Sequence, residues 1–149
     1  MKKRAIMTEA GRRIGVIKGK LIPAIQIGAT PRQIDSLADQ LICADGDYPS
    51  FKTVRGYHHA TCININSGLV HGIPNDIPFK PSDIVTIDLG LVHQGFHVDT
   101  SFTVQLSPQD PETQKFLKVG RQALDAAISQ ALPGNSLFQV SEAMEQVLV

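Results

Sequence analysis

Apolar residues recur at helical spacing near the start of the chain and predict two helices there. Between about residues 8 and 28, one apolar face is formed by Ile14, Ile17, Leu21 and Ile25. Pro23 interrupts this segment and is expected to kink or split the helix, because proline lacks an amide donor. Gly28 can end it.

The start of the second helix has the clearest local signal in the sequence. Thr30 can cap the helix, Pro31 suits the first helical position, and Gln33 completes a capping box. One apolar stripe then follows, made of Ile34, Leu37, Ala38, Leu41 and Ile42. Residues 44–47 are expected to end this helix.

From about residue 54 to 105 the pattern changes to that of strands. Residues 62–66 alternate, residues 70–74 are short and bounded by turn formers, and residues 83–92 and 96–106 flank a turn at 93–95. Two such runs around a short turn are typical of an antiparallel hairpin.

Helical spacing returns after the hairpin. Asp110 and Pro111 are expected to begin a helix that continues to Leu132, and residues 133–135 break it. Ser136 can cap a last helix, whose apolar stripe still runs at the final residues. This stripe has no closing signal, so we expect the chain to be a fragment of a longer protein; an apolar helix end packed under a partner is the alternative.

Composition narrows the class of protein. The chain has 149 residues and no net charge, which excludes a nucleic-acid binder that works by bulk charge. No apolar run approaches the ~18 residues of a membrane span, and the basic N-terminus is followed by too few apolar residues for a signal peptide. Cys43 and Cys62 lack metal-site spacing and are expected to be reduced and buried in a cytoplasmic protein.

The predicted hairpin carries the candidate chemistry. A two-residue loop at His93 and Gln94 would place Asp88 directly opposite Asp99, and a bulge at Gly95 would shift this register by one residue. Strand alternation gives one apolar face, and a polar face that gathers Asp88, Gly90, His97, Asp99, Ser101 and Thr103.

Two opposed aspartates on a sheet need an explanation. Their β-carbons would lie ~5 Å apart, and two carboxylates at that distance repel by roughly 3 kcal/mol at an effective dielectric of 20. A divalent cation, a shared proton, or a fully solvated sheet face would each relieve this repulsion. The apolar residues around Asp88 indicate a buried strand, which favours the metal.

Several motifs together resemble one family. Residues 87–90, the spacing of ten residues between Asp88 and Asp99, and residues 95–101 are similar to the metal-binding hairpin of type I methionine aminopeptidases. Three other stretches agree in order and spacing: residues 7–12, the pocket-forming segment of 48–51 with Gly56, Tyr57 and 62–66, and the histidine loop at 70–74. The resemblance covers roughly residues 6–149.

The resemblance implies the pita-bread α/β (α+β) fold, in which helices pack on a curved antiparallel sheet. Residues 1–149 would be the first half of one catalytic domain. Asp88 would chelate one of two divalent ions (Co, Fe, Mn, Zn or Ni) and Asp99 would bridge both. The other three ligands, a His and two Glu, would come from a second half that this chain lacks, so the isolated chain is expected to be inactive.

The resemblance also implies an activity, the removal of the initiator methionine from nascent polypeptides by a metal-activated water. His71 would bind the substrate and stabilise developing charge, and Tyr57 and Cys62 would line the methionine pocket. Without the resemblance, the sequence favours a loop histidine with satisfied hydrogen bonds at His71, and ordinary core packing is the alternative for Tyr57 and Cys62. Residues 52–55 and 66–68 depart from the family pattern, which leaves the details of the pocket open.

Further expectations follow for the remaining residues and for alternative functions. His97 is read as either supporting the site or structural, and His58, His59 and His93 as surface residues. An Xaa-Pro peptidase of the same fold and a non-catalytic pita-bread binding module are the alternatives. We expect a cytoplasmic monomer that meets nascent N-termini at the ribosome and binds neither specific nucleic acid nor membrane.

Overall fold

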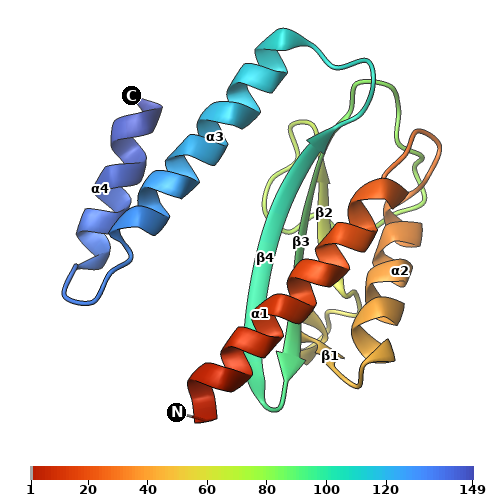
Figure 1. Cartoon of the computed structure of the whole chain (residues 1–149). Helices are drawn as coiled ribbons and strands as arrows, with labels where there is room; N and C mark the ends of the chain where they lie inside the picture. Colours follow the sequence, from red (N-terminus) through yellow and green to blue (C-terminus); the bar gives the residue numbers. More distant parts are fainter. Residues whose placement is uncertain (1) are drawn as a thin grey trace. The chain divides into compact units, whose positions relative to one another are not determined.

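The computed structural model describes residues 2–149, which form two compact units divided after Pro108 (Figure 1). The first unit contains α1 (Lys2–Leu21), η1 (Ile22–Ala24), α2 (Pro31–Ala44), β1 (Tyr48–Pro49), η2 (Ser50–Thr53), β2 (Thr61–Ile65), β3 (Ile84–His93) and β4 (Phe96–Gln105). The second contains α3 (Pro111–Gln130) and α4 (Leu137–Leu148). No helix within residues 2–149 is long and apolar enough to cross a membrane.

Local sequence signals account for most helix boundaries. The first helix does not reach residue 28 as expected, because the chain tightens into a 3-10 turn that contains Pro23. The capping box of α2 is confirmed, with the Thr30 hydroxyl accepting from the Gln33 amide at 3.2 Å. In the second unit, Asp110 and Ser136 cap α3 and α4 as predicted.

The sheet is antiparallel and built around β3. Strand β4 pairs along one side of β3, while β2 and the short β1 share the other side. In the β2 register Cys62 lies opposite Asp88, and Asn64 lies opposite Thr86. Residues 70–74, which the sequence places among the strand signals, form a loop.

The hairpin register differs from the prediction. Gln94 and Gly95 form the turn, and their φ angles are 48° and 81°. Positive φ at both turn positions matches the twist of the flanking strands in a two-residue hairpin. Gly90 therefore lies opposite Asp99, and Asp88 lies opposite Ser101, so the two aspartates are diagonal neighbours rather than a direct pair. The observed pairing differs from the predicted one by two residues. Because side chains alternate with a period of two, each one stays on its predicted face, and the division into an apolar and a polar face is confirmed.

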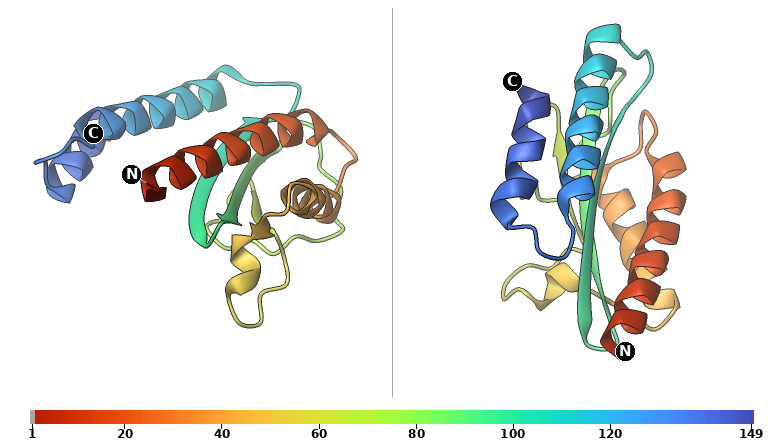
Figure 2. Two further views of the ribbon diagram at one scale, coloured as in Figure 1. Left: turned by 60° about the horizontal axis from the view of Figure 1, so that its bottom comes forward. Right: turned by 60° about the vertical axis from the view of Figure 1, so that its left-hand side comes forward.

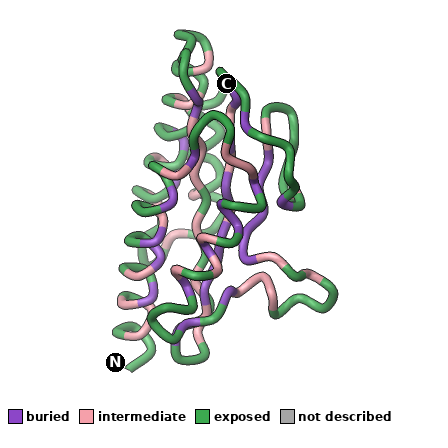
Figure 3. Tube along the Cα trace, turned by 90° about the vertical axis from the view of Figure 1, so that its right-hand side faces the viewer, coloured by how far each residue is buried: buried purple, intermediate pink, exposed green. Residues whose placement is uncertain are grey.

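The core lies between the apolar face of the sheet and helices α1 and α2, which cover that face (Figure 2). Figure 3 shows buried residues recurring along the helices and the strands. Among the fully buried side chains are Leu21, Ile34, Ile42, Val85, Ile87, Leu89 and Leu91. The polar face is left available for a site.

Two residues differ from the prediction in their burial. His93 was expected at the surface, but it is buried and lies 2.7 Å from the Asp47 carboxylate. It is the last residue of β3 and shares the face of Leu89 and Leu91 because the turn starts one residue later than predicted. Cys43 was expected to be buried but is exposed near the end of α2, and both cysteines are free thiols.

Candidate active site

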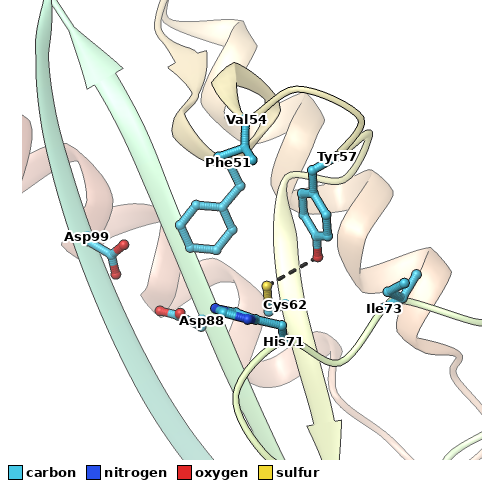
Figure 4. Close-up of a pocket in the computed structure, with 8 residues that line it drawn as sticks. All are labelled: Phe51, Val54, Tyr57, Cys62, His71, Ile73, Asp88 and Asp99. Carbon is cyan, nitrogen blue, oxygen red and sulfur yellow. Dashed lines mark hydrogen bonds between the residues drawn. The ribbon is translucent and has the colours of Figure 1, made fainter.

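A pocket of about 550 Å³ lies over the polar face of the sheet (Figure 4). It is lined by Phe51, Val54, Tyr57, Cys62, His71, Ile73, Asp88 and Asp99. All five residues proposed from the sequence for the site therefore meet in one cavity. Phe51, Val54 and Ile73 complete its apolar wall, and they come from segments that the sequence pattern alone does not bring together.

The two aspartates form the acidic end of the pocket. Asp88 on β3 is half-buried, and Asp99 on β4 is exposed. The pKa of Asp88 is raised to about 6, first by burial and then by the charge of Asp99 and a hydrogen bond with that carboxyl group. His71 opposes this rise in pKa, which places the imidazole within electrostatic reach of Asp88 (Figure 4).

This environment separates the three explanations of the aspartate pair. A freely solvated sheet face would leave the pKa of Asp88 near its ordinary value, so that alternative is disfavoured. A shared proton or a bound cation would relieve the repulsion, and carboxylate oxygens are hard ligands that suit divalent metals. The donor set fits such an ion only in part, because no group of three or more His, Cys, Asp or Glu side chains within residues 2–149 could hold a metal.

Gly90 has no side chain, and this allows η2 to approach the hairpin closely. A Cβ there would lie 2.9 Å from the Ser50 Cβ and 3.2 Å from Phe51 Cε1. The Ser50 hydroxyl lies 2.7 Å from His97 Nδ1 on β4, which ties η2 to the strand that carries Asp99. His97 therefore supports the pocket wall, and Phe51 is held beside the acidic end.

Tyr57 and Cys62 make the neutral wall of the pocket. The Tyr57 hydroxyl donates to the Thr61 carbonyl at 2.7 Å and lies 3.2 Å from Cys62 Sγ (Figure 4). Burial raises the pKa of both the Tyr57 phenol and the Cys62 thiol. Both groups therefore stay uncharged at neutral pH, as an apolar ligand would require.

Asp35 is a supporting residue that the sequence reasoning missed. Its buried carboxylate accepts from the Ala60 amide at 2.9 Å and from the Thr61 amide and hydroxyl at 2.9 and 2.8 Å, and it lies 2.9 Å from His59 Nδ1. His59 is thus half-buried rather than a plain surface residue, whereas His58 is exposed as expected. The available signal was the position of Asp35 on the buried face of α2, where a charge needs partners.

Comparison with known proteins gives a consistent result. Residues 5–149 match the family model described as metallopeptidase family M24. Methionine aminopeptidase 1 of Bacillus subtilis is 33% identical over 140 residues, which cover 94% of this chain and 56% of that protein. The chain spans a little over half the length of this curated relative.

Solved structures agree with the sequence match. The crystal structure of methionine aminopeptidase from Rickettsia prowazekii has a TM-score of 0.94 at 25% identity, with 98% of this chain and 59% of that chain covered. The prolidase from Pyrococcus furiosus has a TM-score of 0.86 at 18% identity, over 99% of this chain and 42% of that chain, and shows that the fold is shared. The expected pita-bread architecture is confirmed.

Proposed function

The chain belongs to metallopeptidase family M24, and we propose that it forms part of a metal-dependent aminopeptidase that removes N-terminal methionine. One observation carries the proposal: an apolar pocket ends at a carboxylate pair with an imidazole beside it. The named relatives support the choice of methionine aminopeptidase within the family. The proposed substrates are the N-termini of newly made polypeptides in the cytoplasm, and the complete protein acts as a monomer.

The apolar wall suits a methionine side chain. Phe51, Val54 and Ile73 offer only hydrocarbon, and the neutral Tyr57 and Cys62 close the pocket. An unbranched thioether adapts to such a wall and gains from contact with aromatic rings. A charged side chain packed on this wall would lose its hydration, and the hydrocarbon offers it no partner, so the wall selects against acidic and basic N-terminal residues.

The aspartates are the proposed metal ligands. Asp88 and Asp99 would hold divalent cations of the kind that oxygen ligands favour. When bound, these ions would supply Lewis-acid activation of the scissile carbonyl and of water at neutral pH. We propose that the remaining ligands come from residues outside this chain, since the described residues supply two carboxylates and no larger ligand group.

His71 is the proposed substrate-contacting residue. His71 is exposed at the pocket wall, and its imidazole lies beside Asp88 on the side away from Val54 (Figure 4). From there it can donate a hydrogen bond to the amide that follows a methionine seated in the pocket. Such a donor stabilises negative charge that develops on the substrate during hydrolysis.

The test begins with the coding DNA past codon 149, followed by assays of the complete gene product with a divalent metal. We expect release of methionine from Met-Ala peptides and no cleavage of Xaa-Pro peptides. Asp99→Asn should abolish release, while Asp76→Asn, on an exposed aspartate paired with Arg32, should leave it unchanged. Xaa-Pro cleavage without methionine release would replace the proposal with the peptidase alternative, and metal binding without any turnover would favour a binding module.

A further inference from the structure

The loop that carries His71 lies against the free edge of β2. Three hydrogen bonds hold it there, and all of them involve two adjacent residues of that strand. The Ile63 amide donates to the Gly72 carbonyl at 2.9 Å. The Asn64 side chain makes the other two, because its Nδ2 donates to the Val70 carbonyl at 2.9 Å and its Oδ1 accepts from the Gly72 amide at 3.1 Å.

The backbone on both sides of His71 is held in a demanding conformation. Val70 has a φ of 65°, which is a strained angle for a β-branched residue. Gly72 approaches the strand so closely that an added Cβ would lie 2.1 Å from the Ile63 carbonyl oxygen and 2.6 Å from Asn64 Oδ1. Such a conformation persists only where neighbouring contacts enforce it, and the contacts here come from β2.

The imidazole itself has little else to fix it. His71 is exposed, and none of the hydrogen bonds among the described residues involves its ring. Its direction therefore depends on the backbone at residues 70–72. Asn64, in contrast, is 7% exposed and sits on the polar face of the sheet opposite Thr86.

We propose that Asn64 is a positioning residue that aims His71 into the pocket by bridging the peptide groups on either side of it. This inference rests on the proposed substrate contact of His71. A side-chain amide suits the task because it offers a donor and an acceptor in one plane, and both are used. A carboxylate would face the Val70 carbonyl with a second acceptor, and a hydroxyl would reach at most one of the two groups.

Asn66 offers a matched control two residues along the chain. Its side chain also makes two hydrogen bonds, donating to Asp83 Oδ1 at 2.9 Å and accepting from the Ile84 amide at 2.9 Å. These bonds fix the start of β3 and do not touch the His71 loop. Because Asn66 has a φ of 54°, Asn66→Gly removes both bonds without backbone strain.

Hydrogen exchange of the Gly72 amide reports on the bridge without any need for activity. In the complete, metal-free protein we expect Asn64→Leu to speed this exchange at least tenfold, since the amide loses its acceptor. Asn66→Gly should leave the Gly72 rate unchanged. An unchanged rate in Asn64→Leu would overturn the inference.

Kinetics then separate positioning from general structural support. With a Met-Ala peptide and metal, we expect Asn64→Leu to lower kcat by roughly 10- to 100-fold, because a small misplacement of a reacting group has effects of that size. In a His71→Ala background the same substitution should change kcat less than twofold. Equal losses in both backgrounds would show that Asn64 does not act through His71. If the unsubstituted protein released no methionine, the proposed function would fail, while the Gly72 exchange rate would still test the bridge.

Discussion

The aspartate pair should destabilise the protein when no metal is present, and Asp88→Asn should relieve this cost. Asp88 has a pKa of about 6 in the folded protein against an ordinary value of 3.8. A difference of this size corresponds to at most about 3 kcal/mol at neutral pH. Because Asp88 is only half-buried and Asp99 is exposed, solvent screening reduces the expected gain to about 1 kcal/mol.

The pH dependence gives this prediction its sign. A carboxyl whose pKa is raised on folding binds more protons in the folded state than in the unfolded state between pH 3.8 and about 6. The free energy of unfolding of the natural sequence therefore falls as pH rises through that window, and the penalty is complete above it. Asparagine does not titrate, so the advantage of Asp88→Asn should be largest at pH 7.5 and fade towards pH 4.

Urea denaturation with a metal chelator measures this effect at both pH values. Adding the metal should reverse the order of stability, because only the natural sequence retains both carboxylates and gains binding free energy on folding. Asp76→Asn serves as a control and should change the free energy of unfolding by less than about 0.5 kcal/mol. If Asp88→Asn gave no gain at pH 7.5, or a gain that did not depend on pH, the electrostatic account of the pair would be wrong.

Three further substitutions test the supports of the site. Leu89→Ala removes a fully buried side chain of β3 and should lower the free energy of unfolding by about 2–5 kcal/mol in urea titration. Gly90→Ala should displace η2, costing about 1–3 kcal/mol and raising KM for a Met-Ala peptide, because its Cβ would lie 2.9 Å from the Ser50 Cβ; an unchanged KM would contradict the role given to this contact. Asp35→Ala leaves the Ala60 and Thr61 amides without their acceptor and should raise KM more than it lowers kcat, as measured by steady-state kinetics.

Features with a local cause could be predicted from the sequence. The capping box at Thr30 and the cap at Ser136 depend on residues within one helical turn, and the structure contains both. The two faces of the hairpin follow from strand alternation, which survives a shift of two residues in pairing. The aspartates could therefore be assigned to one face before their exact pairing was known.

Features with a distant cause were harder to predict. The register depended on placing Gly95 at the second position of the turn, a preference of turn chemistry that apolar spacing does not reveal. The burial of His93 followed from the same one-residue difference. Asp35 and Asn64 act on segments that meet them only in the folded chain, so helical or strand periodicity gives their position but not their partners.

The diagonal placement of the aspartates also bears on how the hairpin finds its register while the chain folds. A register shifted by two residues keeps every apolar side chain on the correct face, so burial alone cannot reject it. The shift that starts the turn at His93 would set Asp88 directly against Asp99. When the two residues are directly opposed rather than diagonal, their carboxylates repel each other by about 1 kcal/mol more at an effective dielectric of 20. The charges proposed to hold the metal thus also select against this mispaired strand, by roughly fivefold in population.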